Sequence, residues 1–541
     1  MRSKISNKLV LALATAVVMS SCAKKLDLFP QNDLTPEKTY STAAGYKSVL
    51  AKIYGTLAVT GNQGAAGQPD INGLDEGSQV AFIRGFFNAQ ELPTDEAVVS
   101  WNDQTIKDFH NLRWTAADPF LKGLYARPIY NITLINEFLR EATDAKLQEH
   151  GISGTDANDV KNARAEVKFL RAFNYWVMMD LFGKSTFLTE DNKIGTDLPG
   201  EIDRKGLFTF VEKELKASLQ ELAPAKSMEY GRVDKAAAWA LLARMYLNAR
   251  VYLDLKTDAD AKSYYTSAIT YADSVIRAGY VLKSGYSKLF MADNDKQKDE
   301  FIWTINCDGL RTSAYGNTTF LVHAASGDNH DELGVGSGWS GYRATKGLAD
   351  LFSDLTGATD QRAMFANQAN MQIADIGDFK QGLWVKKWRN IRSDGQPTSD
   401  PNRDFADIDF PVFRLPEMYF IYTEAVLRGG EGGNTTTALD YMNKIRYRAY
   451  GDSYGSNNSG KLTASDITLP FVLNERGREL YWEGHRRTDL VRYNLLTTGT
   501  YLWPWKGGVA SGTAVDSKYN IFPVPSANLT SNPKLTQNTG Y

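Results

Sequence analysis

The stretch GRVDKAAAWALLARMYLNA, residues 231–249, decides the fold of this 541-residue chain. Asp234 precedes a run of strong helix formers and is a typical N-cap residue, so the stretch predicts a helix. A second helix is predicted at residues 258–277, because one stripe of that segment carries small and apolar side chains at Ala261, Tyr265, Ala268, Ala272 and Val275. Alanines let two helices approach closely, and large aromatic residues stand one turn away. This pattern is typical of the helical hairpins in tetratricopeptide repeats.

Helical periodicity continues on both sides of this hairpin. It is strongest at residues 159–182, where apolar side chains recur every three or four positions. Further helical patterns occupy residues 36–57, 119–145, 414–450 and 468–496. We therefore predict a mainly α protein whose scaffold is built from tetratricopeptide-like hairpins, at about residues 36–57, 119–279 and 413–500.

Two irregular regions rich in Gly, Asn and Asp, about residues 58–118 and 280–412, interrupt this scaffold. They contain only short strand-like runs, such as residues 301–305 and 318–322. Loops on a rigid scaffold commonly carry function, so we expect the binding residues in these regions. Helical repeats can form one long body, and we predict a single domain over residues 36–541.

The first residues predict export and a lipid anchor. Three basic residues precede an apolar run at residues 9–19, which is too short to span a bilayer and is typical of a signal peptide at residues 1–21. The sequence MSSC ending at Cys22 resembles a bacterial lipobox, in which the cysteine is acylated. The only other cysteine is Cys307, and because an oxidising compartment normally favours paired thiols or none, the count supports acylation of Cys22. Residues 22–35 would form a lipidated tether.

Charge and composition argue against nucleic-acid binding. The formal net charge is −2, and it becomes −5 without residues 1–21, which contain three basic and no acidic residues. A nucleic-acid-binding domain usually carries a basic patch instead. The aromatic share of 12%, rich in Tyr and Trp, is the more informative feature, because these side chains suit wet binding surfaces.

The loop GVGSGWSGY, residues 334–342, contains the spacing of a dinucleotide-binding fingerprint at Gly336, Gly338 and Gly341. Such a fingerprint needs a strand directly before it and a helix that begins within it. Acidic residues and a polar linker separate these glycines from the preceding apolar run, so neither condition holds. We interpret the glycines as freeing the backbone to turn and to present Trp339.

The sequence gives little support to catalytic alternatives. The five histidines are scattered, and no His or Cys cluster has zinc spacing. Glycoside hydrolysis needs only two carboxylates, so four acids remain as candidates: Asp75, Glu76, Asp95 and Glu96. We interpret these four as solvated loop acids and helix caps. The charged stretch at residues 474–494 is interpreted as a structural ion-pair network between helices.

Several motifs together resemble the SusD/RagB family of outer-membrane glycan-binding lipoproteins. They are EVKFLRAFNYWVMMDLFG, GRVDKAAAWALLARMYLNA, VFRLPEMYFIYTEAVLRGG, ERGRELYWEGHRRTDLVRYN and FPVPSANLTSNPKLTQNTGY. The variable segments ELPTDEAVVSW, YGNTTFLV and GWSGY resemble those of starch-binding members. The resemblance implies a helical scaffold with a shallow surface site, no catalytic activity, and delivery of starch and maltooligosaccharides to a SusC-type TonB-dependent transporter at the cell surface.

The resemblance also implies the residues of the site. Carbohydrate would be bound by Asp75, Arg84, Trp101, Gln104, Tyr315 and Trp339. The faces of pyranose rings carry C–H groups that lose water favourably against aromatic planes, while their edges need hydrogen-bonding groups. Trp101, Tyr315 and Trp339 would supply the planes, and Asp75, Arg84 and Gln104 the edge contacts. Gln104 replaces an asparagine of the family, keeping the amide on a longer side chain.

A structural calcium ion is the one cofactor expected. Asp407 and Asp409 alternate along an extended segment, so their side chains point the same way, and Asp295 would complete the set. Three other functions stay open from the sequence: binding of a different glycan, a helical glycoside hydrolase, and a tetratricopeptide scaffold that binds peptides.

Overall fold

The computed structural model describes residues 36–62, 64–65, 69–103, 105–192, 195, 198–455 and 460–541. The predicted signal peptide, the tether with Cys22, and Gln104 lie outside these residues. Within them, most of the regular structure is helical and the strands are short, as predicted. None of the helices in this part of the chain is both long and apolar enough to cross a membrane.

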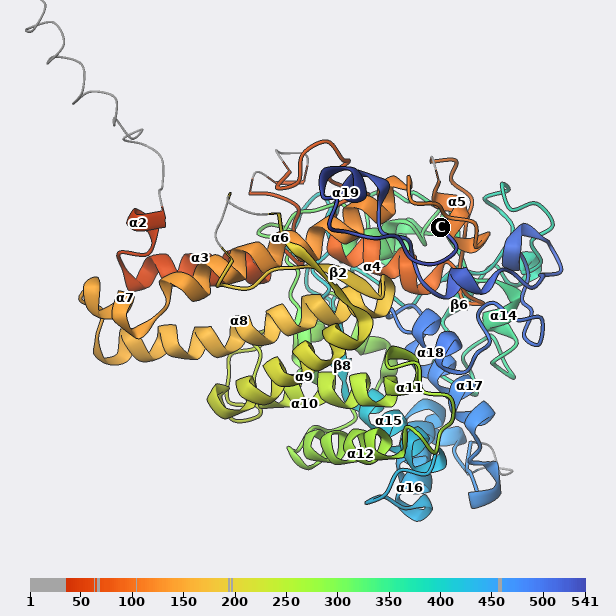
Figure 1. Ribbon diagram of the computed structural model, residues 1–541. Coiled ribbons are helices and arrows are strands. Elements are labelled where there is room, and N and C mark those ends of the chain that lie inside the picture. Colours follow the sequence, from red (N-terminus) through yellow and green to blue (C-terminus); the bar gives the residue numbers. More distant parts are fainter. Residues whose placement is uncertain are drawn as a thin grey trace, which may run out of the picture.

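The helical hairpin predicted from residues 231–277 is present. Helix α10, Lys235–Leu247, lies beside α12, Lys262–Arg277, in the lower half of Figure 1. The Asp234 carboxylate caps α10 by accepting a hydrogen bond from the Ala236 N–H at 2.8 Å. The alanines of α10 are fully buried, so the close approach predicted from them is confirmed.

Longer helices extend this layer. Helix α8, Gly154–Leu181, packs between α6, Pro119–Glu141, and α9, Arg204–Glu221, and α3, Ala43–Gly55, also packs against α8. Figure 1 shows these helices as successive rows from α3 at the top to α12 at the bottom. Smaller helices on this side are α2 Pro36–Thr39, α7 Asp144–Glu149 and α11 Ala249–Tyr252.

The C-terminal helices close the scaffold. Helix α15, Leu415–Leu427, packs against α12, α16 (Thr435–Tyr450) and α17 (Leu469–Leu480). Two shorter helices follow, α18 Arg486–Arg492 and α19 Ser526–Ser531. The helices predicted at residues 414–450 and 468–496 are therefore present, each as two helices with a turn between them.

The strands form antiparallel pairs in the part of the chain that the structure describes. They are β1 Val98–Val99 with β5 Tyr342–Arg343, β2 Lys184–Phe187 with β3 Gly200–Asp203, β4 Phe301–Ile305 with β8 Phe410–Arg414, and β6 Phe365–Ala366 with β7 Trp384–Val385. The strand predicted at residues 301–305 is thus confirmed as β4. The other predicted strand is wrong, because Thr318–His323 forms helix α13, whose start is capped by the Asn317 side chain.

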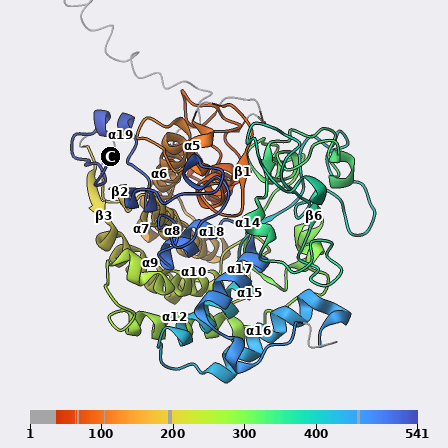
Figure 2. The same ribbon diagram turned by 90° about the vertical axis from the view of Figure 1, so that its right-hand side faces the viewer.

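Helices also run through the two regions predicted to be irregular. Helix α4, Phe82–Glu91, is buried at every position, including its polar residues Arg84, Asn88 and Glu91. The remaining short elements are α5 Ile106–His110, α14 Lys346–Ala349, and the 3₁₀ turns η1 Tyr286–Phe290, η2 Asn294–Gln297, η3 His330–Leu333, η4 Gln368–Asn370, η5 Gly451–Ser453, η7 Ala464–Asp466, η8 Lys506–Gly508 and η9 Ser517–Asn520. Figure 2 shows this loop-rich side at the right.

A buried ion-pair network joins the C-terminal helices to the rest of the molecule. The Glu479 carboxylate on α17 accepts hydrogen bonds from Arg414 and Arg448, and Arg414 also binds Glu483 at 2.6 Å. These side chains are 0–4% exposed. The structural interpretation of the charged stretch is confirmed.

The interpretation of Asp95 and Glu96 as solvated loop acids is wrong. Asp95 is fully buried, and its two carboxylate oxygens accept hydrogen bonds from Arg486 at 2.7 and 2.6 Å. Glu96 is 1% exposed and accepts a hydrogen bond from the Trp482 N–H at 3.0 Å. Both acids anchor the loop before β1 to the C-terminal helices.

Candidate functional site

The β1–β5 pair brings together two tryptophans that are far apart in the sequence. Val98 lies opposite Arg343 and Val99 opposite Tyr342, and the Ser100 N–H continues the ladder by donating to the Gly341 oxygen at 2.9 Å. Trp101 follows directly, and its ring packs against that of Tyr342 with centroids 5.0 Å apart. Trp339 lies just before the other strand. This short ladder therefore fixes both loops at one place.

The glycines of residues 334–342 allow the backbone of this loop to pass close to neighbouring groups that a side chain would clash with. Gly341 has φ +99°, and a Cβ there would lie 2.3 Å from the indole nitrogen of Trp101. A Cβ at Gly338 would lie 2.5 Å from the Gly327 oxygen, and one at Gly336 would lie 2.8 Å from the Asn402 oxygen. The segment leads into strand β5 and not into a helix, so the structure lacks the helix N-terminus that a phosphate-binding fingerprint requires.

Trp339 rests on a histidine. Its ring stacks on that of His323, with centroids 4.6 Å apart and planes 27° from parallel, and the backbone N–H of Trp339 donates to the backbone oxygen of His323 at 2.9 Å. Tyr315, which is 38% exposed, stands edge-on to Trp339 at 6.0 Å and contacts Phe405 at 5.2 Å. Trp339 itself is half-buried. One side of this ring is thus supported from below, and neighbouring rings hold it in place.

Arg84 is a buried cation among aromatic rings. It lies on α4, is 7% exposed, and places its guanidinium 4.7 Å from the centroid of Phe320 and 5.4 Å from that of Trp101. Its Nη1 donates to the Gly77 oxygen at 3.1 Å, but its buried Nε has no partner. No carboxylate of the described residues lies within 4 Å of it to form an ion pair, and burial lowers its pKa.

Asp75 lies on an exposed turn beside this cluster. One carboxylate oxygen accepts hydrogen bonds from the Ser78 N–H at 2.7 Å and from the Ser78 hydroxyl at 2.5 Å. The same turn contains Gly77, where an added Cβ would lie 3.3 Å from the Cβ of Tyr315. The turn therefore connects Asp75, Arg84 and Tyr315. The structure gathers all the predicted carbohydrate-binding residues that it describes, and their roles as sugar contacts stay predictions.

Two supporting residues were missed by the sequence reasoning, and both lie on α13. Phe320 faces Trp101 and Arg84, while His323, one helical turn later, carries Trp339. His323 is 1% exposed, and burial lowers the pKa of its ring. Phe320 and His323 are three residues apart, which is a helical spacing, but the β-prone residues of TTFLV predict a strand instead.

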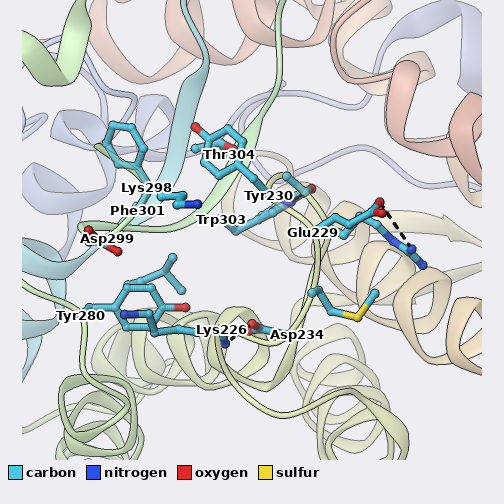
Figure 3. A pocket seen from close by; sticks show the side chains of 14 residues that line it. Lys226, Glu229, Tyr230, Asp234, Tyr280, Lys298, Asp299, Phe301, Trp303 and Thr304 are labelled. Carbon is cyan, nitrogen blue, oxygen red and sulfur yellow. Dashed lines mark hydrogen bonds and ion pairs between the residues drawn. The ribbon is translucent and has the colours of Figure 1, made fainter. Parts of the chain in front are cut away.

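Trp101, Tyr315 and Trp339, with Arg84 and Asp75, form an aromatic platform that lies outside five depressions of the described surface, which are lined by other side chains. Figure 3 shows one of them, of about 160 Å³, between the loop before α10 and strand β4. Its wall contains the helix cap Asp234, the half-buried Tyr230 and the ring of Trp303, which is 2% exposed.

The predicted calcium ligands lie near one another but do not form a ready metal site. Among the described residues, no group of three or more His, Cys, Asp or Glu side chains is arranged to hold a metal ion. Burial, together with the negative charges of Asp295 and Asp407, raises the pKa of Asp409 to about 7. Asp407 accepts hydrogen bonds from the Gly309 and Ser399 N–H groups at 2.9 and 2.7 Å.

Comparison with known proteins identifies the family. A model described as the SusD family matches residues 356–541. The starch-binding protein SusD of Bacteroides thetaiotaomicron is 35% identical to this chain over 592 aligned residues, which cover 100% of both proteins. The chain belongs to the SusD family. The SusD-like protein P25 of Formosa agariphila is 23% identical, covering 96% of this chain and 97% of that protein.

Solved SusD-family structures share the fold. A SusD homolog from Bacteroides thetaiotaomicron superposes with a TM-score of 0.70 at 18% identity, covering 94% of this chain and 99% of that one. Surface glycan-binding protein A from Bacteroides fluxus gives a TM-score of 0.68 at 18% identity, covering 92% of this chain and 100% of that one. At such identities the match concerns the fold alone. It confirms the predicted fold class, a mainly helical SusD-like scaffold.

Proposed function

We propose that this SusD-family chain binds starch and maltooligosaccharides at the cell surface without cleaving them and passes them to a SusC-type TonB-dependent outer-membrane transporter. The observation that carries the proposal is the convergence of Trp101, Tyr315 and Trp339 around Arg84. These rings are separated in the sequence. The β1–β5 strand pair, the buried helix α4 and close glycine contacts bring them together.

The chemistry of the cluster suits a glucan. Aromatic planes at differing angles match the two faces of successive sugars, and α-1,4 links make each glucose turn relative to the last. Trp339 and Tyr315 already stand 60° apart. Arg84 and Asp75 add a donor and an acceptor for the hydroxyl groups at the ring edges. A relative that is 35% identical over its whole length is named a starch-binding protein, which favours starch over other glycans.

The enzyme alternative has little support from the geometry. A glycosidase needs two carboxylates on either side of a sugar bond, with access to it. Asp95 and Glu96 are buried and bound to Arg486 and Trp482, so neither can reach a ligand on the surface. Asp75 and Asp103 are both exposed acids near Arg84 and the aromatic rings, so the reducing-end assay described below decides against or for the hydrolase. Family membership agrees with the prediction that the chain is not an enzyme.

The membrane anchor and the calcium ion are further parts of the proposal. Several acyl chains at Cys22, at about 0.8 kcal/mol per buried CH₂, would hold the protein durably on the outer membrane. Cys22→Ala is expected to move it to the soluble fraction. Calcium would neutralise the charge of Asp409, which is buried beside Asp295 and Asp407, and the melting temperature should then fall when a chelator is added.

Affinity electrophoresis tests the proposed function. The wild-type chain should be retarded in gels that contain amylopectin or pullulan and should migrate freely in a β-1,4-glucan, whose straight chain does not fit angled rings. Incubation with starch should release no reducing ends. Equal migration in all three gels would contradict the starch proposal, and new reducing ends would favour the hydrolase.

A further inference from the structure

A second aromatic pair, one exposed ring and one half-buried ring, lies far from the Trp101 cluster. Tyr447, on α16, is 64% exposed, and its ring meets that of Tyr454 at 5.3 Å with planes 83° apart. In such an edge-to-face pair each ring keeps at least one face that its partner does not cover. In both views α16 lies at the opposite end of the molecule from α5, the helix that follows Trp101 (Figures 1 and 2).

The pair borders an open depression of about 790 Å³, within the usual size range of small-molecule sites. One wall is the outer face of α16, and the other is the loop after α12, where Val281 is 52% exposed. An exposed Tyr beside an exposed Val is an apolar patch, and such patches commonly mark interaction sites. The fold gains little from leaving both side chains in water.

One of the two rings is firmly placed. The Tyr454 hydroxyl donates to the Asn443 side-chain oxygen at 2.9 Å. The Asn443 amide in turn bonds both the N–H and the oxygen of Leu462, at 2.9 and 3.2 Å. Tyr454 is therefore held by a bonded network, as Trp339 is held by His323. A ring fixed before binding costs less entropy to use.

Polar groups of both signs surround the rings. Asp440 and Lys444 form an exposed ion pair at 2.7 Å, and Gln361 and Asp452 add exposed amide and carboxylate groups. Arg448 also borders the depression, but its charge is already paired with Glu300 and Glu479. The balance of charge disfavours an anionic ligand. Open aromatic faces with neutral and mixed polar edges match an uncharged pyranose chain.

We propose that the Tyr447–Tyr454 surface is a second glucan-binding site. This inference rests on the proposed function and extends it. Two weak sites at opposite ends of one protein would hold a long polymer more tightly than a short oligosaccharide, because the second contact becomes intramolecular once the first has formed. The second site should therefore matter for amylopectin and hardly at all for maltoheptaose bound at the first site.

The test compares three variants in amylopectin gels and in maltoheptaose titrations. Tyr447→Ala should weaken amylopectin retardation by about threefold to tenfold, as expected for one lost stacking contact, and should leave the strong maltoheptaose site unchanged. Tyr447→Phe keeps the plane and should restore retardation. Leu198→Ala, which removes another exposed apolar side chain (47% exposed) outside both surfaces, should behave as the wild type.

Saturation-transfer NMR isolates the second site. In the Trp101→Ala/Trp339→Ala background, maltoheptaose should still receive weak saturation, and adding Tyr447→Ala should remove it. The second site alone would be overturned if amylopectin retarded Tyr447→Ala as strongly as the wild type. It would also be overturned if adding Tyr447→Ala left the NMR signal intact. Either result would leave this face for a protein partner. A wild type that amylopectin does not retard would contradict the proposed function itself.

Discussion

Two buried arginines show how differently the scaffold and the site are built. Arg414, in the scaffold, is 2% exposed and pairs with Glu300, Glu479 and Glu483. Burial acts to lower its pKa, but the charges of Glu483 and Glu479 outweigh this and raise it. Arg84, in the site, is 7% exposed, faces aromatic rings and has a lowered pKa. The scaffold satisfies its own charges, whereas the site keeps a cation available for a ligand.

The largest effect should come from breaking the scaffold network. Arg414→Met leaves three buried carboxylates without their shared partner, and we expect the free energy of unfolding to fall by about 3–5 kcal/mol. Urea unfolding followed by circular dichroism measures this. A loss below about 1 kcal/mol would mean that the network contributes little to stability and that the contrast with Arg84 is false.

The matched change in the site should act in the opposite way. Arg84→Met removes a buried cation that has no ion-pair partner among the described residues, so stability should be unchanged or slightly higher. Affinity for maltoheptaose should drop by about tenfold, since a charge-assisted hydrogen bond to the sugar is lost. Calorimetry and urea unfolding of the same preparation test both halves. If Arg84→Met lowered the free energy of unfolding but kept the wild-type affinity, Arg84 would belong to the scaffold and not to the site.

Acid should weaken the scaffold through Glu479. Burial acts to raise the pKa of Glu479, but Arg448, Arg414 and Arg362 outweigh it and lower the pKa to about 2. Because the folded pKa lies below the unfolded value of about 4.5, this stabilisation is complete above pH 4.5 and is lost as the pH falls towards 2. Glu479→Gln should flatten this part of the stability profile. An unchanged slope would show that Glu479 does not carry it.

A smaller effect is expected from the ring beneath Trp339. His323→Ala removes this support, and maltoheptaose affinity should fall by about threefold to tenfold while the chain stays folded. His323→Phe keeps a flat ring of similar width and should bind nearly as well as the wild type. If Phe weakened binding as much as Ala does, the imidazole nitrogens would matter and not the stacking.

The sequence predicted the scaffold well where long segments carry helix formers and apolar side chains at helical spacing. Asp234 marked the start of α10, and the alanines of that helix indicated close packing. Helices α4 and α13 were not predicted, because both are short and lie within regions whose composition is typical of loops. Asp95 looked like a solvated loop acid because its partner, Arg486, lies nearly four hundred residues away.

The site was predicted residue by residue only through the family resemblance. Composition and loop position favoured exposed aromatic rings, but they could not tell that Trp101 meets Gly341 or that His323 lies beneath Trp339. Those contacts depend on the β1–β5 pair, whose two-residue strands are too short to recognise in a sequence. Exposure was also overestimated, because Trp101 and Trp339 are half-buried.

The most direct test of the account is maltoheptaose calorimetry on Trp101→Ala/Trp339→Ala, with folding checked by circular dichroism. A millimolar site has only about 4 kcal/mol in total, and each stacked ring contributes on the order of 1 kcal/mol, so the strong binding event should disappear in the double variant. The variant should remain folded, with a moderate loss of stability because both rings are half-buried. Wild-type affinity in a folded double variant would contradict the assignment of this platform as the glucan site.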